Sequence, residues 1–85
     1  MSEKHPWYVY ILKCSDGTLY TGITTDTIRR LEEHNNGTGA RYTRGRSPVK
    51  LVYRTGAEDR SEASRLEYQI KKRSRKQKKK LIDNQ

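Results

Sequence analysis

The hydrophobic positions of this chain gather in short segments that are separated by polar and glycine-rich stretches. The segment from Trp7 to Lys13 carries aromatic and β-branched residues at both odd and even positions, which predicts a strand covered on both faces. Residues 18–23 predict the returning strand of a hairpin, because the turn-forming run Ser15-Asp16-Gly17 precedes them. The alternation from Val49 to Arg54 predicts a third strand.

Helical periodicity follows the hairpin and returns after the third strand. The first helix is expected from about Thr27 to Asn35 and the second from about Glu62 to Arg73, and residues 75–83 have helical propensity. The capping candidates are Asp26 or Thr25 for the first helix and Asp59 or Ser61 for the second.

The resulting order, β-β-α-β-α-α, predicts one mixed α/β (α+β) domain over residues 1–85. We expect a small three-stranded, mostly antiparallel sheet that is flanked by helices. Residues 35–48, between the first helix and the third strand, are typical of a glycine-rich basic loop.

The hairpin turn decides where two phenols point. A two-residue turn would send Tyr10 and Tyr20 to opposite faces of the sheet. A three-residue loop over residues 15–17, with Gly17 in the left-handed conformation, sets Tyr10 opposite Gly22 and puts both phenols on one face. We expect the three-residue loop, with a pocket beside the Tyr10 hydroxyl because its facing residue has no side chain. Taken alone, two such tyrosines are ordinary packing residues of a half-buried strand.

The predicted first helix has an apolar stripe of Ile28 and Leu31. Arg30 and His34 are four residues apart and flank Leu31, so both are expected to border the sheet. A single histidine in such a place is usually structural, whereas a cation and an imidazole together suggest a site.

A carboxylate interrupts the apolar stripe of the predicted second helix. Glu67 lies within the stripe that runs from Ala63 to Ile70, and a buried carboxylate is costly without a cation beside it. Arg30, a metal ion or both are the expected partners. The alternative is an intrahelical pair with Lys71 that turns Glu67 toward water.

Charge is distributed unevenly along the chain. Residues 1–40 carry four Lys/Arg and five Asp/Glu, whereas residues 41–85 carry fifteen Lys/Arg and five Asp/Glu. This basic half points to a polyanionic partner, with nucleic acid as the leading candidate. No segment is apolar enough to span a membrane and the first residues do not resemble a signal peptide, so a cytoplasmic protein is expected.

Two basic segments are the candidate nucleic-acid contacts. In the glycine-rich loop the arginines would hold phosphates while Tyr42 stacks on an exposed base, and the basic run beginning at Lys71 would hold the backbone. The alternative is a solvated helix whose charge serves solubility. The predicted contacts are Arg41, Tyr42, Arg44, Arg46, Lys71, Lys72, Arg73, Arg75 and Lys76.

Together these residues resemble the GIY-YIG nuclease superfamily, over residues 7 to about 75. Tyr8-Val9-Tyr10 and Tyr20-Thr21-Gly22 stand where the family has its two triplets, and Arg30, His34 and Glu67 follow in the family's order. The ordered set is specific, although each triplet alone is weak. The position of His34 and the basic loop are most similar to the small stand-alone bacterial members and to the Slx-type endonucleases.

The resemblance implies phosphodiester hydrolysis with one divalent metal, Mg²⁺ or Mn²⁺, held by Glu67. It implies Tyr10 or Tyr20 as the general base. We expect Tyr10 in that role, with Tyr20 orienting water or phosphate, Arg30 neutralising phosphoryl charge, and a place for His34 beside them. The expected substrate is DNA selected by structure, such as a branched or partly single-stranded form, in repair or recombination.

Four positions depart from the family pattern. Tyr8 replaces the glycine of the first triplet and Thr21 the isoleucine of the second, while the phenols and Gly22 remain. Ile23 stands where some members carry a lysine that assists the base, and Lys79 where some carry an asparagine.

Two other functions therefore stay open. One is a basic DNA- or RNA-binding module that keeps the fold without cutting, and the other is an RNA-associated protein whose tyrosines only pack. A chain of 85 residues has little room for a targeting domain, so a protein partner is a candidate source of specificity.

Overall fold

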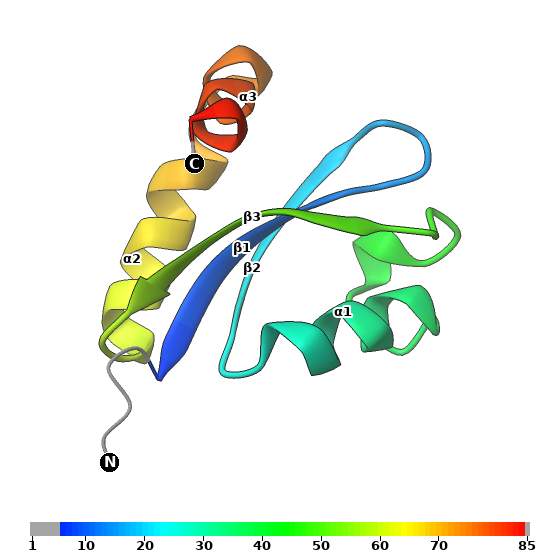
Figure 1. The fold of residues 1–85 in the computed structure, drawn as a ribbon, viewed down its shortest axis with the longest axis horizontal. Helices are drawn as coiled ribbons and strands as arrows, with labels where there is room; N and C mark the ends of the chain where they lie inside the picture. Colours follow the sequence, from blue (N-terminus) through cyan, green and yellow to red (C-terminus); the bar gives the residue numbers. More distant parts are fainter. Residues whose placement is uncertain (1–5, 85) are drawn as a thin grey trace.

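The computed structural model describes residues 6–84 and contains a three-stranded sheet with helices on both sides (Figure 1). The element order β-β-α-β-α-α and the α+β class agree with the prediction. The elements are β1 (Trp7–Lys13), β2 (Leu19–Thr24), α1 (Thr27–Asn35), a short 3₁₀ turn η1 (Arg41–Thr43), β3 (Lys50–Ala57), α2 (Arg60–Lys71) and α3 (Arg75–Asp83).

The sheet has the order β2-β1-β3 and is antiparallel throughout. Because β1 is the central strand, its side chains are covered on both faces, as predicted. Val9 and Ile11 join the core with α2 and α3, whereas Tyr10 and Leu12 join a second core with α1. Figure 1 shows the same division, with α2 and α3 on one side of the sheet and α1 on the other.

The hairpin closes through the predicted three-residue loop. Gly17 has a φ of +86°, and the Cys14 amide donates to the Thr18 carbonyl at 2.8 Å. Tyr10 consequently pairs with Gly22, and both phenols lie on the α1 face.

Each helix begins at a side chain that accepts from its first turn. Asp26 accepts from the Arg29 amide and Asp59 from the Glu62 amide, while Ser74 forms a full capping box with Gln77. The basic run of residues 71–80 thus begins at the last residue of α2, continues through the connecting residues 72–74 and ends within α3. Within residues 6–84, no helix has the length and apolar character that crossing a bilayer requires.

The predicted stripe of α1 is wrong at Ile28, whose side chain is 71% exposed. Thr27 and His34 are buried instead, and Leu31 packs against the core between them. Ile28 and His34 lie about 120° apart around the helix, on either side of Leu31. The helix has therefore turned its histidine side, and not its isoleucine side, toward the sheet.

Candidate active site

The Tyr10 ring lies directly over the backbone of β2. Tyr10 is only 2% exposed, and a methyl group added at Gly22 would lie 2.6 Å from its hydroxyl oxygen and 2.8 Å from Cζ. Only glycine leaves room for the ring at this register position. The predicted empty pocket beside the hydroxyl is wrong, because the phenol itself fills the space.

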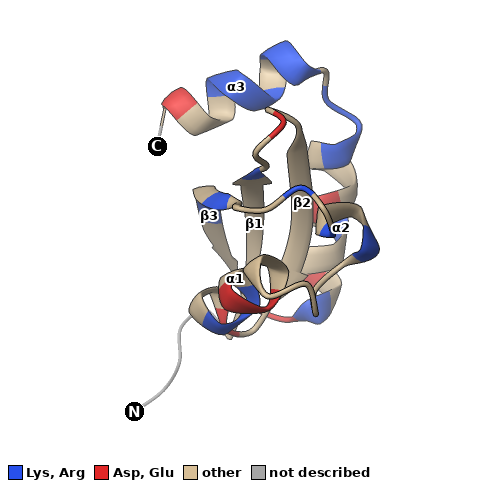
Figure 2. Cartoon of the chain, turned by 90° about the vertical axis from the view of Figure 1, so that its right-hand side faces the viewer, with Lys and Arg blue, Asp and Glu red and all other residues tan. Residues whose placement is uncertain are grey.

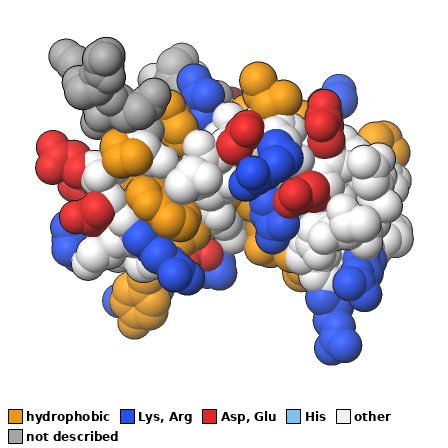
Figure 3. Space-filling view, turned by 90° about the horizontal axis from the view of Figure 1, so that it is seen from below, with side chains coloured by type: hydrophobic (Ala, Val, Ile, Leu, Met, Phe, Trp, Pro, Cys, Tyr) orange, Lys and Arg blue, Asp and Glu red, His pale blue; other side chains and the backbone are white. Residues whose placement is uncertain are grey.

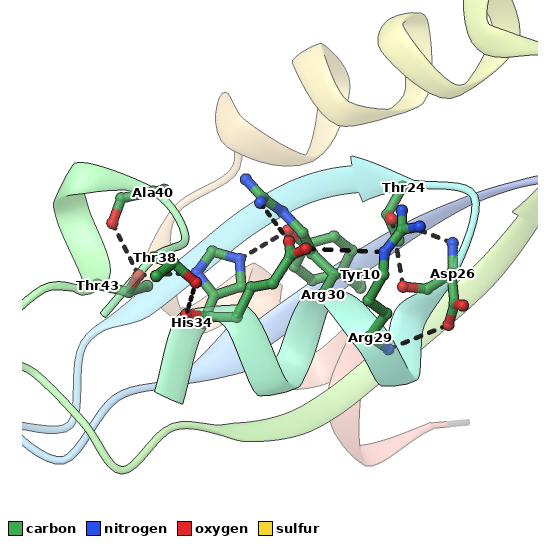
Figure 4. Close-up of polar contacts among 10 residues, drawn as sticks. Tyr10, Thr24, Asp26, Arg29, Arg30, His34, Thr38, Ala40 and Thr43 are labelled. Carbon is green, nitrogen blue, oxygen red and sulfur yellow. Dashed lines mark hydrogen bonds and ion pairs between the residues drawn. The ribbon is translucent and has the colours of Figure 1, made fainter. Parts of the chain in front are cut away.

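The Tyr10 hydroxyl begins a chain of hydrogen bonds that ends in the loop after α1 (Figure 4). It lies 3.0 Å from His34 Nε2, and His34 Nδ1 lies 2.7 Å from Thr43 Oγ1. The Thr43 hydroxyl donates its own proton to the Ala40 carbonyl at 2.9 Å. Thr43 must therefore accept from Nδ1–H, and the free lone pair of Nε2 accepts the Tyr10 O–H.

Burial keeps both members of this pair uncharged. It raises the pKa of Tyr10 to about 12, against the opposing effect of Arg30. Burial, followed by the charge of Arg30, lowers the pKa of His34 below its usual value. At neutral pH the site holds a neutral phenol that donates to a neutral imidazole.

The loop after α1 supports His34 by close packing as well as by the Thr43 bond. A methyl group at Gly39 would lie 2.6 Å from His34 Nδ1 and 2.9 Å from Cα, so this position requires glycine. Thr43 is 1% exposed. Sequence reasoning missed both residues, because the loop contains three glycines and two threonines and the sequence does not single out these two.

Tyr20 completes an aromatic cluster on the same face. Its ring centre lies 6.4 Å from that of Tyr10, 5.2 Å from that of His34 and 5.7 Å from that of Tyr42. The prediction that the two phenols share a face is confirmed by these distances.

Arg30 borders the sheet, as predicted, with a side chain that is 31% exposed. Its guanidinium donates to Glu33 at 2.8 Å and acts electrostatically on both Tyr10 and His34. Arg30 does favour the Tyr10 phenolate, as expected, but burial outweighs it.

A comparison with known families decides what this arrangement belongs to. The model of the GIY-YIG catalytic domain matches residues 6–80, which is most of the chain. The chain belongs to the GIY-YIG catalytic domain family. This membership supports a nuclease-type function with nucleic acid as the substrate class, and GIY-YIG nucleases typically use a divalent metal.

Relatives and solved structures agree with this assignment. A UPF0213 protein of Desulfotalea psychrophila is 56% identical over 95% of this chain and 74% of its own length. A UPF0213 protein of Halobacterium salinarum is 57% identical over 88% of this chain and 97% of its own length. A solution structure of a protein from E. faecalis is 45% identical, with a TM-score of 0.62 over 96% of this chain and 85% of its own. The predicted resemblance to small stand-alone GIY-YIG proteins is thus confirmed.

Glu67, the carboxylate expected at the site from the sequence, pairs with a different residue from the one expected. Its side chain is 23% exposed and pairs with Lys71 at 3.0 Å, while Arg30 pairs with Glu33. The expected Glu67–Arg30 pair is therefore wrong, because each side chain pairs within its own helix, and for Glu67 the alternative pair with Lys71 is the one observed. Glu67 still acts on Tyr10, since its negative charge contributes to the raised pKa of the phenol.

A hydrated divalent ion fits the donor set of this GIY-YIG site. Among residues 6–84 no three His, Cys, Asp or Glu side chains gather where they could hold a metal. Mg²⁺ needs few protein ligands, because it keeps several waters and is completed by substrate phosphate. One partly exposed carboxylate, Glu67, meets that requirement.

Several of the predicted nucleic-acid contacts already interact with neighbouring residues, including Lys72, which lies 5.1 Å over the Tyr68 ring. Arg46 pairs with Asp16 and lies 4.3 Å over the Tyr42 ring, and Arg75 donates to the Gly17 carbonyl at 2.8 Å. Tyr42 is 41% exposed, but its ring already contacts Tyr20 and Arg46, so a base stacking there would compete with these contacts. The other predicted contacts, apart from Lys71, are exposed and appear in none of the ion pairs of residues 6–84: Arg41, Arg44, Lys72, Arg73 and Lys76.

Proposed function

We propose that this GIY-YIG protein is a metal-dependent endonuclease that hydrolyses phosphodiester bonds of DNA. The observation that supports it most is the chain from Tyr10 through His34 to Thr43, which gives a buried phenol a defined proton acceptor. A phenol with a pKa of about 12 cannot be a base at neutral pH without such an acceptor.

In the proposed mechanism Tyr10 relays a proton. A lone pair of its oxygen takes the proton of the attacking water while its own proton moves to His34 Nε2, so no free phenolate forms. His34 then carries the positive charge and keeps its Nδ1–H bond to Thr43. Tyr20, in the same cluster, would orient the water or the phosphate.

The phosphate needs positive charge beside this pair. Arg30 is partly exposed at the site and would neutralise the phosphoryl oxygens as charge builds on them. Mg²⁺ or Mn²⁺, held by Glu67, water and the phosphate, would supply charge stabilisation at the leaving oxygen.

The basic surface would bind the substrate through its backbone. Figure 2 shows Lys and Arg concentrated along α3 and the segment before it. Backbone contacts read shape and not base sequence, so we propose selection of branched or partly single-stranded DNA, consistent with repair or recombination in the cytoplasm. A protein partner would add any further specificity.

Two observations favour a second candidate, a non-catalytic basic DNA- or RNA-binding module. Tyr10 is almost completely buried, and Glu67 is neutralised by Lys71. In such a module both would serve stability alone.

Cleavage assays with Glu67→Gln separate the two candidates. We expect wild type to cut labelled forked DNA in Mg²⁺ or Mn²⁺, and Glu67→Gln to bind but not cut; Glu32→Gln, which removes an exposed acid of α1, is the matched control and should cut normally. Binding without cutting by wild type in either metal would support the module and overturn the nuclease.

A further inference from the structure

A basic pocket lies on the face of the sheet opposite the hydrogen-bonded residues Tyr10, His34 and Thr43. The pocket, of about 170 Å³, opens at the hairpin end of the sheet, beneath α3. It is lined by Lys13, Leu19, Val52, Arg75, Lys79, Ile82 and Asp83.

Three cations from β1 and α3 converge on this pocket. Lys13 comes from the end of β1, Arg75 from the first turn of α3 and Lys79 from the next turn. None of them belongs to the four ion pairs found among residues 6–84. The bond of Arg75 to the Gly17 carbonyl holds its guanidinium in place, so the site is pre-organised for an anion.

Of the other four lining residues, three are apolar, and Asp83 at the end of α3 carries a carboxylate. Leu19, Val52 and Ile82 belong to the edge of the core that α2 and α3 cover. A free phosphate would leave these side chains uncovered, whereas a nucleotide unit would place its sugar and base edge against them. We infer that this pocket binds one nucleotide of a nucleic acid, with its phosphate held by Lys13, Arg75 and Lys79.

The position of the pocket indicates which nucleic acids can use it. Tyr10 and His34 lie on the α1 face, and the pocket lies on the opposite face. The hairpin turn lies between the Tyr10–His34 pair and the pocket. Arg46 of the basic loop contacts the turn at Asp16, and Arg75 of α3 contacts it at Gly17.

A straight duplex on the catalytic face would not reach the pocket behind the turn. A substrate that forks or bends at the turn can send one arm to each face. This part of the inference rests on the proposed function and assigns the pocket to the second arm.

Binding measurements in EDTA test the pocket without any cleavage. The pocket variant is Lys13→Gln/Lys79→Gln; the control, Lys76→Gln/Lys80→Gln, removes the same charge from exposed positions of α3 outside this pocket. We expect the control substitutions to lower the affinity for forked and for linear DNA equally. The pocket substitutions should lower the affinity for forked DNA by about tenfold more than the affinity for linear DNA. Equal losses on both DNAs for both variants would overturn the inference.

A second measurement locates the ligand. In amide NMR titrations, the dinucleotide pTpT should shift the signals of Lys13, Leu19 and Ile82 at lower concentration than inorganic phosphate does, and the pocket variant should abolish the shifts. Equal responses to phosphate and pTpT would reduce the site to a simple anion site and contradict the nucleotide. Because both experiments measure binding, a failure to cut DNA leaves their outcome unaffected.

Discussion

The two sides of the sheet use polar residues in opposite ways. On the α1 side, His34 and Thr43 are buried and joined through hydrogen bonds to Tyr10. On the other side, α3 has no buried residue and is mostly lysine and arginine. The underside of the molecule in Figure 3 differs again, because acidic and basic side chains are mixed there. Burial fixes protonation states and geometry, which chemistry requires, whereas solvated charge gives adaptable affinity for a polyanion.

The strongest test of this contrast removes the proton acceptor. His34→Phe keeps a ring but leaves the Tyr10 hydroxyl without its partner, and cleavage should fall by about 10²- to 10⁴-fold. His34→Gln keeps a hydrogen-bond acceptor that cannot take up a proton, so it should cut DNA nearly as slowly as His34→Phe. Its thermal stability should be higher than that of His34→Phe. Single-turnover cleavage and thermal unfolding check both variants. A fully active His34→Phe would show that the α1 side is only structural.

The fit of Tyr10 against Gly22 can be tested next. Gly22→Ala would force the ring to move and should lower the free energy of unfolding by about 1–3 kcal/mol. Tyr10→Phe removes the oxygen that lies closest to the added methyl, so the double variant should lose less stability than the two single losses predict together. Additive losses in urea denaturation would contradict this contact.

Thr43 should have a smaller effect, because it acts on His34 and not on the substrate. Thr43→Val leaves His34 Nδ1–H unsatisfied and should destabilise the fold by about 1–3 kcal/mol. Cleavage should fall by roughly tenfold, in line with that loss of hydrogen bonding, and Thr43→Ser should restore both properties. In ¹⁵N NMR, wild type should show the Nδ1–H tautomer, and Thr43→Val a mixture. If His34 kept the Nδ1–H tautomer in Thr43→Val, the proposed role of Thr43 in fixing that tautomer would be contradicted.

The pH dependence of stability gives the smallest effect. His34 has a lowered pKa in the fold, so the unfolded chain binds its proton more readily. The contribution of neutral His34 to the free energy of unfolding is complete above about pH 6.5, and it is lost as the pH falls through the pKa of His34 in the folded protein. Wild type should therefore lose more stability than His34→Gln when the pH is lowered from 7 to 5. Parallel pH curves for the two proteins would count against a buried neutral histidine.

The sequence allowed the local parts of this account to be predicted. The Gly17 loop fixed the hairpin register, and with it the shared face of Tyr10 and Tyr20, because a turn depends on adjacent residues. The stripe of α1 could not be predicted, because Ile28 and His34 both flank Leu31 and only tertiary packing selects the side. Thr43 and Gly39 escaped for the same reason, since their contacts with His34 depend on the path of an irregular loop.

The most direct measurement is single-turnover cleavage of forked DNA by wild type and Tyr10→Phe, with binding measured in parallel in EDTA. We expect Tyr10→Phe to bind DNA as tightly as wild type and to cut it at least about 10²-fold more slowly. Equal cutting by the two proteins would contradict the proposed role of Tyr10, and Tyr68→Phe, a change at a mostly exposed tyrosine, should cut at the wild-type rate.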